Sequence, residues 1–305
     1  MNKKIINTLG IIGLGMCMTT ALTSCNEEEI KVYTRDTSSG TRDGFFTKIG
    51  FEDAVKDDSV LVEGYVRVDS NSQMISSIKN DKYGIGYISL SSLSSSGLKG
   101  LTYEGVAPTE ENVVNGTYSL TRNFNYCMRE TYANDTVKGI ISAFVAYMST
   151  TEGNATIKNN GGIIEKAATT SWNDIKANYS VASSDNSSVT INVGGSTSVE
   201  KIVSALLVEF QAKCGNFKYN YNPTGSSDAY KRTNGADKDS ANAIDLGFAS
   251  REFKSSETMA DTLKGKMCID AIVAVVNEDN DIDSITAQQL VDIYNGTTTK
   301  WDDLK

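Results

Sequence analysis

Residues 32–46 read VYTRDTSSGTRDGFF and place a strand, a polar turn and the start of a helix in succession. The strand ends near Thr34, and the helix is expected to begin at Ser39–Thr41. Free backbone N–H groups and hydroxyls at a helix N-terminus bind oxyanions, and Gly40 lets the backbone approach a ligand closely. Arg35 can donate two parallel hydrogen bonds to a tetrahedral anion. On this local pattern alone, an ordinary helix cap beside a solvated arginine is the more common explanation.

The same arrangement recurs at three further places in the chain. Residues 193–199 (VGGSTSV) again combine a strand, a glycine-rich turn and a helix start, and residues 223–228 (PTGSSD) follow another expected strand. Ser250 and Arg251 close a fourth strand, Asp245–Ala249. Ligands of α/β proteins bind at the carboxyl ends of parallel strands. The four turns therefore predict one shared binding site.

The whole chain alternates short β-branched runs with amphipathic segments, which indicates an α/β fold. A helix from Ser198 has one apolar stripe that ends at Phe210. Residues 159–189 are rich in Asn, Ser, Ala and Gly and are expected to be a linker or a loosely held surface segment. The other expected helices are Ala133–Ser149 and Thr286–Tyr294, and the expected strands are Ile30–Thr34, Val60–Tyr65, Gly84–Ser89, Val189–Val193, Phe217–Asn222, Asp245–Ala249 and Ile269–Asn277.

Residues 1–25 are expected to be a lipoprotein signal peptide. Lys3 and Lys4 precede the apolar stretch Ile5–Leu22, which contains no acidic residue, and small residues then lead to Cys25. This order is typical of a secretory signal. The end of the stretch resembles the lipobox of bacterial lipoproteins, which implies cleavage before Cys25 and attachment of lipid there. A transmembrane anchor is the alternative, but the stretch contains several glycines and is barely long enough to span a bilayer.

The composition favours binding of a small ligand over catalysis or nucleic-acid binding. The net charge is −9 without a cluster of basic residues, which argues against nucleic acid as a partner. The chain contains no histidine, and this removes the commonest general base and most zinc sites. Cys127, Cys214 and Cys268 are an odd number without Cys-x-x-Cys spacing, so we expect free thiols. We expect no catalytic residue, no metal and no cofactor.

Taken together, the turns resemble those of a known family. Arg35–Thr41, Gly195–Val199, Gly225–Ser227 and Asp245–Arg251 resemble the signature turns of PstS-like phosphate-binding lipoproteins of phosphate ABC transporters. This resemblance implies a two-lobed type II periplasmic-binding-protein fold. It extends over nearly the whole mature chain through three supporting stretches, Gly84–Leu90, Ile269–Asn277 and Leu290–Leu304.

The order of these turns differs from the usual order in the family. The Arg-x-x-x-Ser-Gly-Thr turn normally lies late in the chain, whereas here it comes first. The chain therefore looks circularly permuted, which proteins tolerate where the old termini are close and the new ones are exposed. A fusion of fragments from two gene copies is the alternative. The permuted fold implies one lobe from residues 26–120 plus 277–305 and a second lobe from residues 121–276, which includes the linker 159–189.

The resemblance also implies a function and a set of ligand-binding residues. The protein is expected to be an extracytoplasmic monomer, anchored to the cell membrane through lipid on Cys25, that captures inorganic phosphate and delivers it to the permease subunits of an ABC transporter. The family often places an Asp where this chain has Ser250. The sequence therefore supports binding of an oxyanion more strongly than specificity for phosphate. Asp36 and Glu252 are the two candidates to take the role of this Asp. The expected phosphate-binding residues are Arg35, Ser39, Gly40, Thr41, Thr197, Ser198, Ser226, Ser250 and Arg251.

Other functions stay open at this point. The protein could carry sulfate, molybdate or a phosphonate, or it could be a surface phosphate sensor or an adhesion protein that keeps the fold. A hydrolase of phosphate esters with Ser39 as nucleophile is the alternative from another class. The lack of histidine and of any acidic or cysteine cluster at metal spacing argues against it.

Overall fold

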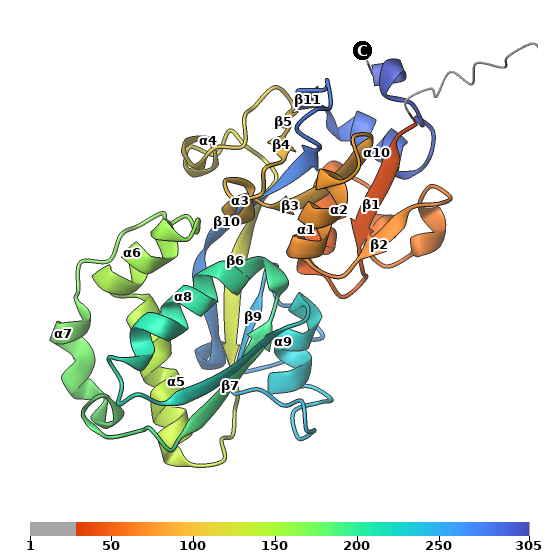
Figure 1. The fold of residues 1–305 in the computed structure, drawn as a ribbon. Coiled ribbons are helices and arrows are strands. Elements are labelled where there is room, and N and C mark those ends of the chain that lie inside the picture. Colours follow the sequence, from red (N-terminus) through yellow and green to blue (C-terminus); the bar gives the residue numbers. More distant parts are fainter. Residues whose placement is uncertain (1–28, 305) are drawn as a thin grey trace, which may run out of the picture.

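The computed structural model describes residues 29–304 and contains a nine-stranded mixed sheet that extends through two lobes, together with a small two-stranded sheet (Figure 1). The strand order is β2-β1-β3-β10-β6-β9-β7-β8, with β4 paired to β10 beside this path. Helices pack against the sheet in both lobes, which confirms the predicted α/β class. Cys25 and the rest of the expected signal peptide lie outside the described residues. Among residues 29–304, no helix is both long and apolar enough to cross a membrane.

The first lobe is built on three parallel strands joined by two helices. In chain order its elements are β1 (Lys31–Arg35), α1 (Gly40–Ile49), β2 (Val66–Val68), α2 (Asn71–Lys79) and β3 (Gly84–Ser89). The first strand lies between the other two and is parallel to both. The carboxyl end of β1 therefore lies next to the N-terminus of the helix that follows it.

The second lobe repeats this connectivity. Its elements are β7 (Thr190–Gly195), α8 (Glu200–Gln211), β8 (Lys218–Pro223), α9 (Ser226–Thr233) and β9 (Leu246–Ala249). Again the first strand, β7, lies between the other two and is parallel to both. The two lobes are thus built on equivalent strand–helix units, in which β1 corresponds to β7 and α2 to α9.

Two long antiparallel strands connect the lobes, β6 (Thr121–Met128) and β10 (Lys264–Val276). The first part of β10 pairs with β6, and residues from Ile272 onward pair with β3 of the first lobe. Figure 1 shows both strands running from one lobe to the other. Ile272, Ala274 and Val276 pack in the core of the first lobe, although the sequence analysis groups them with the second.

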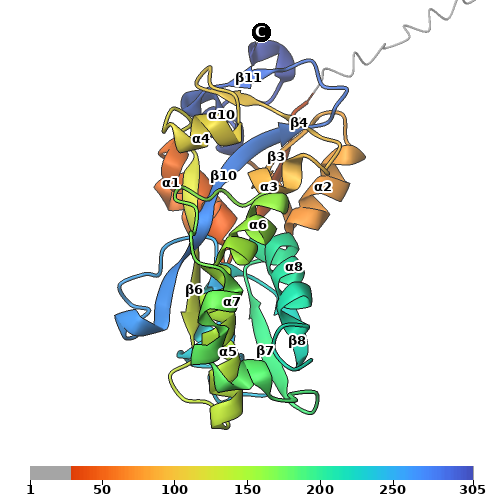
Figure 2. The same ribbon diagram turned by 90° about the vertical axis from the view of Figure 1, so that its left-hand side faces the viewer.

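The remaining elements cover the sheet and its ends (Figure 2). Short 3-10 turns separate several of them. They are α3 (Leu90–Leu93), β4 (Lys99–Gly100), β5 (Thr102–Tyr103), α4 (Glu110–Val114), α5 (Asp135–Met148), α6 (Thr151–Asn159), α7 (Trp172–Ile175), β11 (Ser284–Ile285) and α10 (Ala287–Tyr294).

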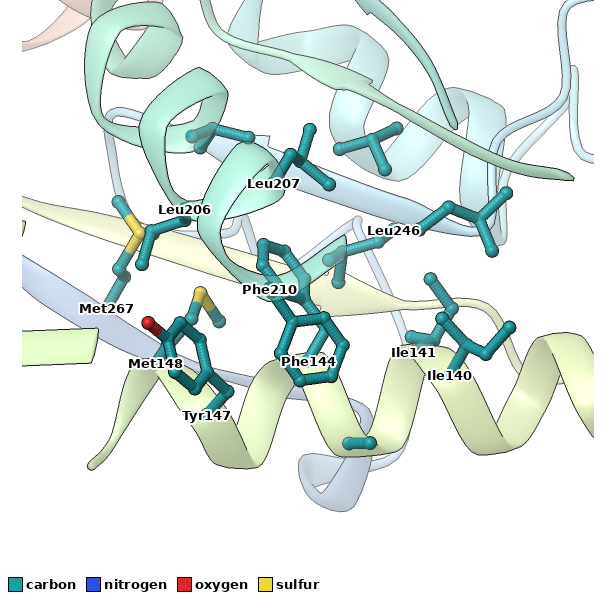
Figure 3. Close-up of a cluster of buried hydrophobic side chains, with 14 of the residues drawn as sticks. Ile140, Ile141, Phe144, Tyr147, Met148, Leu206, Leu207, Phe210, Leu246 and Met267 are labelled. Carbon is teal, nitrogen blue, oxygen red and sulfur yellow. The ribbon is translucent and has the colours of Figure 1, made fainter. Parts of the chain in front are cut away.

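The apolar stripe predicted on α8 forms the centre of the second lobe's core. Leu206, Leu207 and Phe210 of this helix are fully buried. They face α5, where the ring centroids of Phe144 and Tyr147 lie 5.4 and 5.2 Å from that of Phe210 (Figure 3). Side chains spaced three and four residues apart share one face of a helix, which is why the sequence pattern locates this contact correctly.

Two expectations about secondary structure are wrong, and one strand was missed. Residues 60–65 form no strand; the strand of this region is β2, which begins at Val66. The strand β6 carries Arg122 and several asparagines and was not anticipated from the sequence. Residues 159–189 are not a loosely held linker, because Trp172 is buried against Tyr179 and Asn186 is buried and donates hydrogen bonds to two backbone carbonyls.

Candidate binding site between the lobes

Three serines from the second lobe form the centre of the candidate site. The hydroxyl of Ser250, which follows β9, lies 2.9 Å from the Oγ of Ser196 and 3.0 Å from the Oγ of Ser226. The backbone N–H of Ser250 also donates to Ser226 at 2.9 Å. All three side chains are buried. The polar turns after β7, β8 and β9 therefore meet at one point, as the sequence analysis predicts.

A left-handed glycine makes this convergence possible. Gly195, the last residue of β7, has φ of 111°, a conformation that disfavours a side chain. A Cβ atom at this position would lie only 2.1 Å from the backbone oxygen of Phe248 in β9. The close approach positions the N–H of Ser196 to donate to the same oxygen at 2.7 Å.

The first lobe contacts this cluster through the N-terminus of α1. Ser39 caps the helix, and its Oγ accepts the backbone N–H groups of Thr41 and Arg42 at 3.2 and 3.3 Å. The hydroxyl of Thr41 lies 2.7 Å from that of Ser198 in the other lobe. Gly40 lies so close to Ser226 that an added Cβ would be 2.3 Å from the serine Oγ. The lobes are thus in direct contact at the predicted turn.

Arg35 lies at the end of β1 with only 1% of its surface exposed. Its Nη2 donates to the backbone oxygen of Asp69 at 2.9 Å and to the Oγ1 of Thr197, across the lobe boundary, at 3.2 Å. The one ion-pair contact described for it is a long one, 4.0 Å to Asp36. Burial lowers the pKa of this guanidinium. Its Nε and Nη1 are buried without a hydrogen-bond partner among the described residues.

Two other deeply buried arginines, Arg42 and Arg122, each face a carboxylate at close range. Arg42 contacts Asp58 at 2.6 Å and donates to backbone oxygens as well. Arg122 on β6 donates through Nε and Nη2 to Asp270 on β10, at 3.0 and 2.8 Å. These two guanidinium groups are neutralised inside the protein, whereas that of Arg35 lacks a comparably close partner.

Arg251 differs from the other expected site residues. Its guanidinium forms two 2.8 Å hydrogen bonds with the carboxylate of Glu257 and reaches the serine cluster only at its edge, 3.4 Å from the Oγ of Ser227. Burial raises the pKa of Glu257, but the hydrogen bonds from Arg251 and from the backbone of Lys254 outweigh it and lower the pKa overall. The other expected residues, from Arg35 to Ser250, gather at the lobe boundary.

Neither of the two carboxylates considered in the sequence analysis, Asp36 and Glu252, takes the place of the Asp that the family often has at Ser250. Asp36 accepts the backbone N–H of Ser38 at 2.8 Å, so it belongs to its own turn. Glu252 accepts a hydrogen bond from Asn123 at 2.7 Å. Neither carboxylate is hydrogen-bonded to the serine cluster.

Comparisons with known proteins agree with this architecture. A family model for a PBP superfamily domain matches residues 180–305. Phosphate-binding protein PstS 2 of Streptococcus agalactiae serotype V is 27% identical over 301 residues, which cover 97% of this chain and 95% of that protein. Phosphate-binding protein PstS 2 of Streptococcus pneumoniae serotype 4 is 26% identical over 99% of both chains.

A solved structure shows the same similarity. The crystal structure of a phosphate ABC transporter, phosphate-binding protein from S. pneumoniae TIGR4 covers 91% of this chain and all of its own, with 26% identity and a TM-score of 0.65. The chain resembles PstS proteins along nearly its whole length. The resemblance inferred from four short turns is thereby confirmed.

Two residues near the PstS-like turns were not anticipated from the sequence. Ser196 connects the cluster, since its Oγ bonds Ser250 and also accepts the backbone N–H of Ser198 at 3.1 Å. Asn71 is the first residue of α2 and is buried near the lobe boundary. Residues 68–72 (VDSNS) carry the same strand–turn–helix signal as the other turns. The signal was missed because the strand was placed at Val60–Tyr65.

Proposed function

We propose that the protein is an extracytoplasmic solute-binding protein that captures inorganic phosphate between its lobes and delivers it to an ABC permease. The observation that carries the proposal is Arg35, a buried guanidinium with two unpartnered nitrogens at a cluster of hydroxyls. Leaving such donors buried and unpaired costs free energy. A bound dianion supplies the missing acceptors and the missing negative charge.

The surrounding groups suit a tetrahedral oxyanion. A buried dianion is stable only if nearly all its oxygens accept hydrogen bonds. We assign Arg35 to the charge, Thr197, Ser198 and Ser226 to hydroxyl donors, and the N-terminus of α1 to backbone donors. Ser39, Gly40 and Thr41 belong to that helix N-terminus. Ser250 holds the hydroxyls of Ser196 and Ser226 in place through its hydrogen-bond contacts with both. Arg251 contributes from the edge of the site, because Glu257 already occupies its guanidinium.

Phosphate is favoured over sulfate, molybdate and phosphonates by the similarity to PstS proteins, and the hydroxyl cluster itself suits each of these anions. A role as a phosphate sensor would use the same site. A hydrolase is disfavoured, because the Ser39 Oγ accepts two backbone N–H groups and serves as a helix cap. We therefore propose binding without catalysis, by a monomer that needs neither metal nor cofactor.

The same proposal includes lipid anchoring of the protein to the membrane and a circular permutation of its elements. Residues 1–25 are a signal peptide, and lipid on Cys25 ties the first lobe to the outer face of the cell membrane. Residues 26–120 with 272–305 form one lobe and residues 121–271 the other, and they close by bending where β6 and β10 pass from one lobe to the other. The equivalence of the two strand–helix units supports a permutation, since either unit can come first. The end-to-end alignment of the relatives argues against a fusion of fragments.

Titration calorimetry on the chain from Asn26 onward tests the proposal. We expect one phosphate site and a loss of affinity of about 100-fold or more in Arg35→Ala, as for removal of one partner of a buried charged pair. Arg67→Ala is the control, since Arg67 is an exposed arginine nearby. Unchanged phosphate affinity in Arg35→Ala would refute the assigned role. Turnover of a phosphate ester by the wild-type chain would show that the protein is a hydrolase and would overturn the proposed binding function.

A further inference from the structure

Asn71 is a buried amide without a partner. Only 4% of its surface is exposed, and neither its Oδ1 nor its Nδ2 has a hydrogen-bond partner among the described residues. The other buried asparagines of the described residues are used differently: Asn186 donates to two backbone carbonyls, and Asn125 and Asn280 each donate to one. An unpaired amide is costly in the interior of a protein. Its presence therefore calls for a ligand that the fold itself does not supply.

The position of Asn71 connects it to the proposed site. It lines a cavity of about 310 Å³ together with Ser92, Thr197 and Ser198. Thr197 also accepts the hydrogen bond from Arg35, and the same guanidinium nitrogen donates to the backbone oxygen of Asp69, two residues before the asparagine. Asn71 and Arg35 are thus both connected to Thr197, the first through a shared cavity and the second through a hydrogen bond.

The equivalence of the two lobes gives an independent reason. Asn71 is the first residue of α2, and Ser226 is the first residue of α9, the equivalent helix of the second lobe. Ser226 is fully buried and takes part in the hydroxyl cluster. The first lobe thus places an amide where the second places a hydroxyl, each at the N-terminus of the helix after the second strand of its unit.

We propose that Asn71 is a ligand-binding residue that sets the selectivity of the site among tetrahedral oxyanions; this inference rests on the proposed function. Its Nδ2 can donate to an unprotonated oxygen, and its Oδ1 can accept the proton of hydrogen phosphate. Neither end of the amide is fixed by the protein, so it can turn to suit either kind of oxygen. A carboxylate cannot adapt in this way, and it would repel fully ionised sulfate.

Three variants test this role in the chain from Asn26 onward, with inorganic phosphate and sulfate as probes. Asn71→Ala is expected to lower phosphate affinity about tenfold, the equivalent of one hydrogen bond. It is also expected to raise the melting temperature of the ligand-free protein by about 2–4 °C, because an unpaired buried amide is removed. Asn71→Asp is expected to raise the ratio of phosphate to sulfate affinity at least tenfold. Ser76→Ala, at an exposed serine of the same helix that does not line the cavity, should change neither quantity.

The opposite shifts in affinity and melting temperature distinguish a ligand-binding asparagine from a structural one. A fall of both in Asn71→Ala would assign a structural role and overturn the inference. Unchanged affinity in Asn71→Ala, together with lost affinity in Arg35→Ala, would overturn it while leaving the proposed function intact. If the wild-type chain binds neither anion, the proposed function itself fails. An unchanged phosphate-to-sulfate ratio in Asn71→Asp would refute the part played in selectivity.

Discussion

The two lobes have the same connectivity but bring different chemistry to the boundary between them. The first lobe contributes Arg35, which has no carboxylate at close range. The second contributes the hydroxyls of Ser196, Ser226 and Ser250, and its own arginine, Arg251, is neutralised by Glu257. The strand–helix unit of the first lobe thus supplies an unpaired positive charge to the boundary, and that of the second lobe supplies uncharged hydroxyl donors.

This difference implies that neither lobe is a binding site alone. A dianion bound to Arg35 without the hydroxyls would leave most of its oxygens unpaired, and the hydroxyls without Arg35 would leave its charge uncompensated. The ligand therefore stabilises the arrangement in which the lobes meet. Binding energy of this kind can drive a population shift between separated and closed lobes.

The largest expected effect concerns the strands that join the lobes. Arg122 and Asp270 face each other across β6 and β10 and are both buried. Asp270→Asn leaves the guanidinium of Arg122 without a countercharge, so we expect a loss of about 3–5 kcal/mol in the free energy of unfolding. Urea denaturation measures this loss, and both lobes should lose stability together because the strands belong to both.

Asp283→Asn provides the matched control for this prediction. Asp283 pairs with Lys99 at 2.8 Å, but 83% of its side chain is exposed. Exposed pairs contribute about 1 kcal/mol or less. Equal losses in the two variants would contradict the view that the buried pair holds the connection between the lobes.

The second prediction concerns a substitution at the contact between the lobes that leaves the cores of both lobes unchanged. In Gly40→Ala the new methyl group would overlap Ser226, whose Oγ and Cβ lie 2.3 and 2.8 Å from the added atom. The lobes must then stay slightly apart and lose two or three hydrogen bonds to ligand or to each other. We expect phosphate affinity to fall about 100-fold, or about 2.7 kcal/mol. Calorimetry measures the affinity, and the melting temperature without ligand should change little.

A compensating substitution sharpens this test. Ser226→Gly removes the Oγ and Cβ of Ser226, two of the three atoms that the new methyl group would meet, and leaves the Oγ of Ser250 at 2.8 Å. Gly40→Ala should therefore cost much less affinity in a Ser226→Gly background than in the wild-type protein. Equal costs in the two backgrounds would mean that the alanine acts through something other than this steric overlap.

The parts of the fold that sequence reasoning located are those with local signals. The stripe on α8 follows from helical periodicity, and the strand Gly84–Ser89 matches β3 at both ends. The strand β6 was missed because it carries the polar Arg122, which is stabilised by Asp270, 148 residues away in sequence. A partner at that distance in sequence leaves no local pattern.

The same limit applies to the candidate site. The turns at Arg35, Ser196 and Ser226 were located because each has glycine and hydroxyl residues at a helix start. The turn at Asn71 has serines at a helix start but no glycine, and the preceding strand β2 has only three residues and was displaced in the prediction. The pairing of Arg251 with Glu257 depends on how an irregular loop folds back, so no periodicity predicts it.

The smallest expected effect tests whether the arginine of the second lobe is structural. Arg251 and Glu257 are largely buried, with side chains 6% and 11% exposed. Glu257→Gln keeps the shape but removes the charge. Because Arg251 still donates to the backbone oxygen of Glu252, we expect a loss of about 2 kcal/mol in the free energy of unfolding at neutral pH, less than for Asp270→Asn. Thermal unfolding of the wild-type protein and the variant measures it.

The pH dependence of this loss follows from the lowered pKa of Glu257 in the folded protein. A group whose pKa is lower in the folded than in the unfolded state stabilises the fold above its unfolded pKa, near 4.5 for Glu. This stabilisation disappears as the pH falls through the folded pKa. The melting temperatures of wild type and Glu257→Gln should thus differ most above about pH 5 and converge in acid. A difference that stays constant with pH would mean that the ion pair does not hold Arg251, and the contrast with Arg35 would lose its basis.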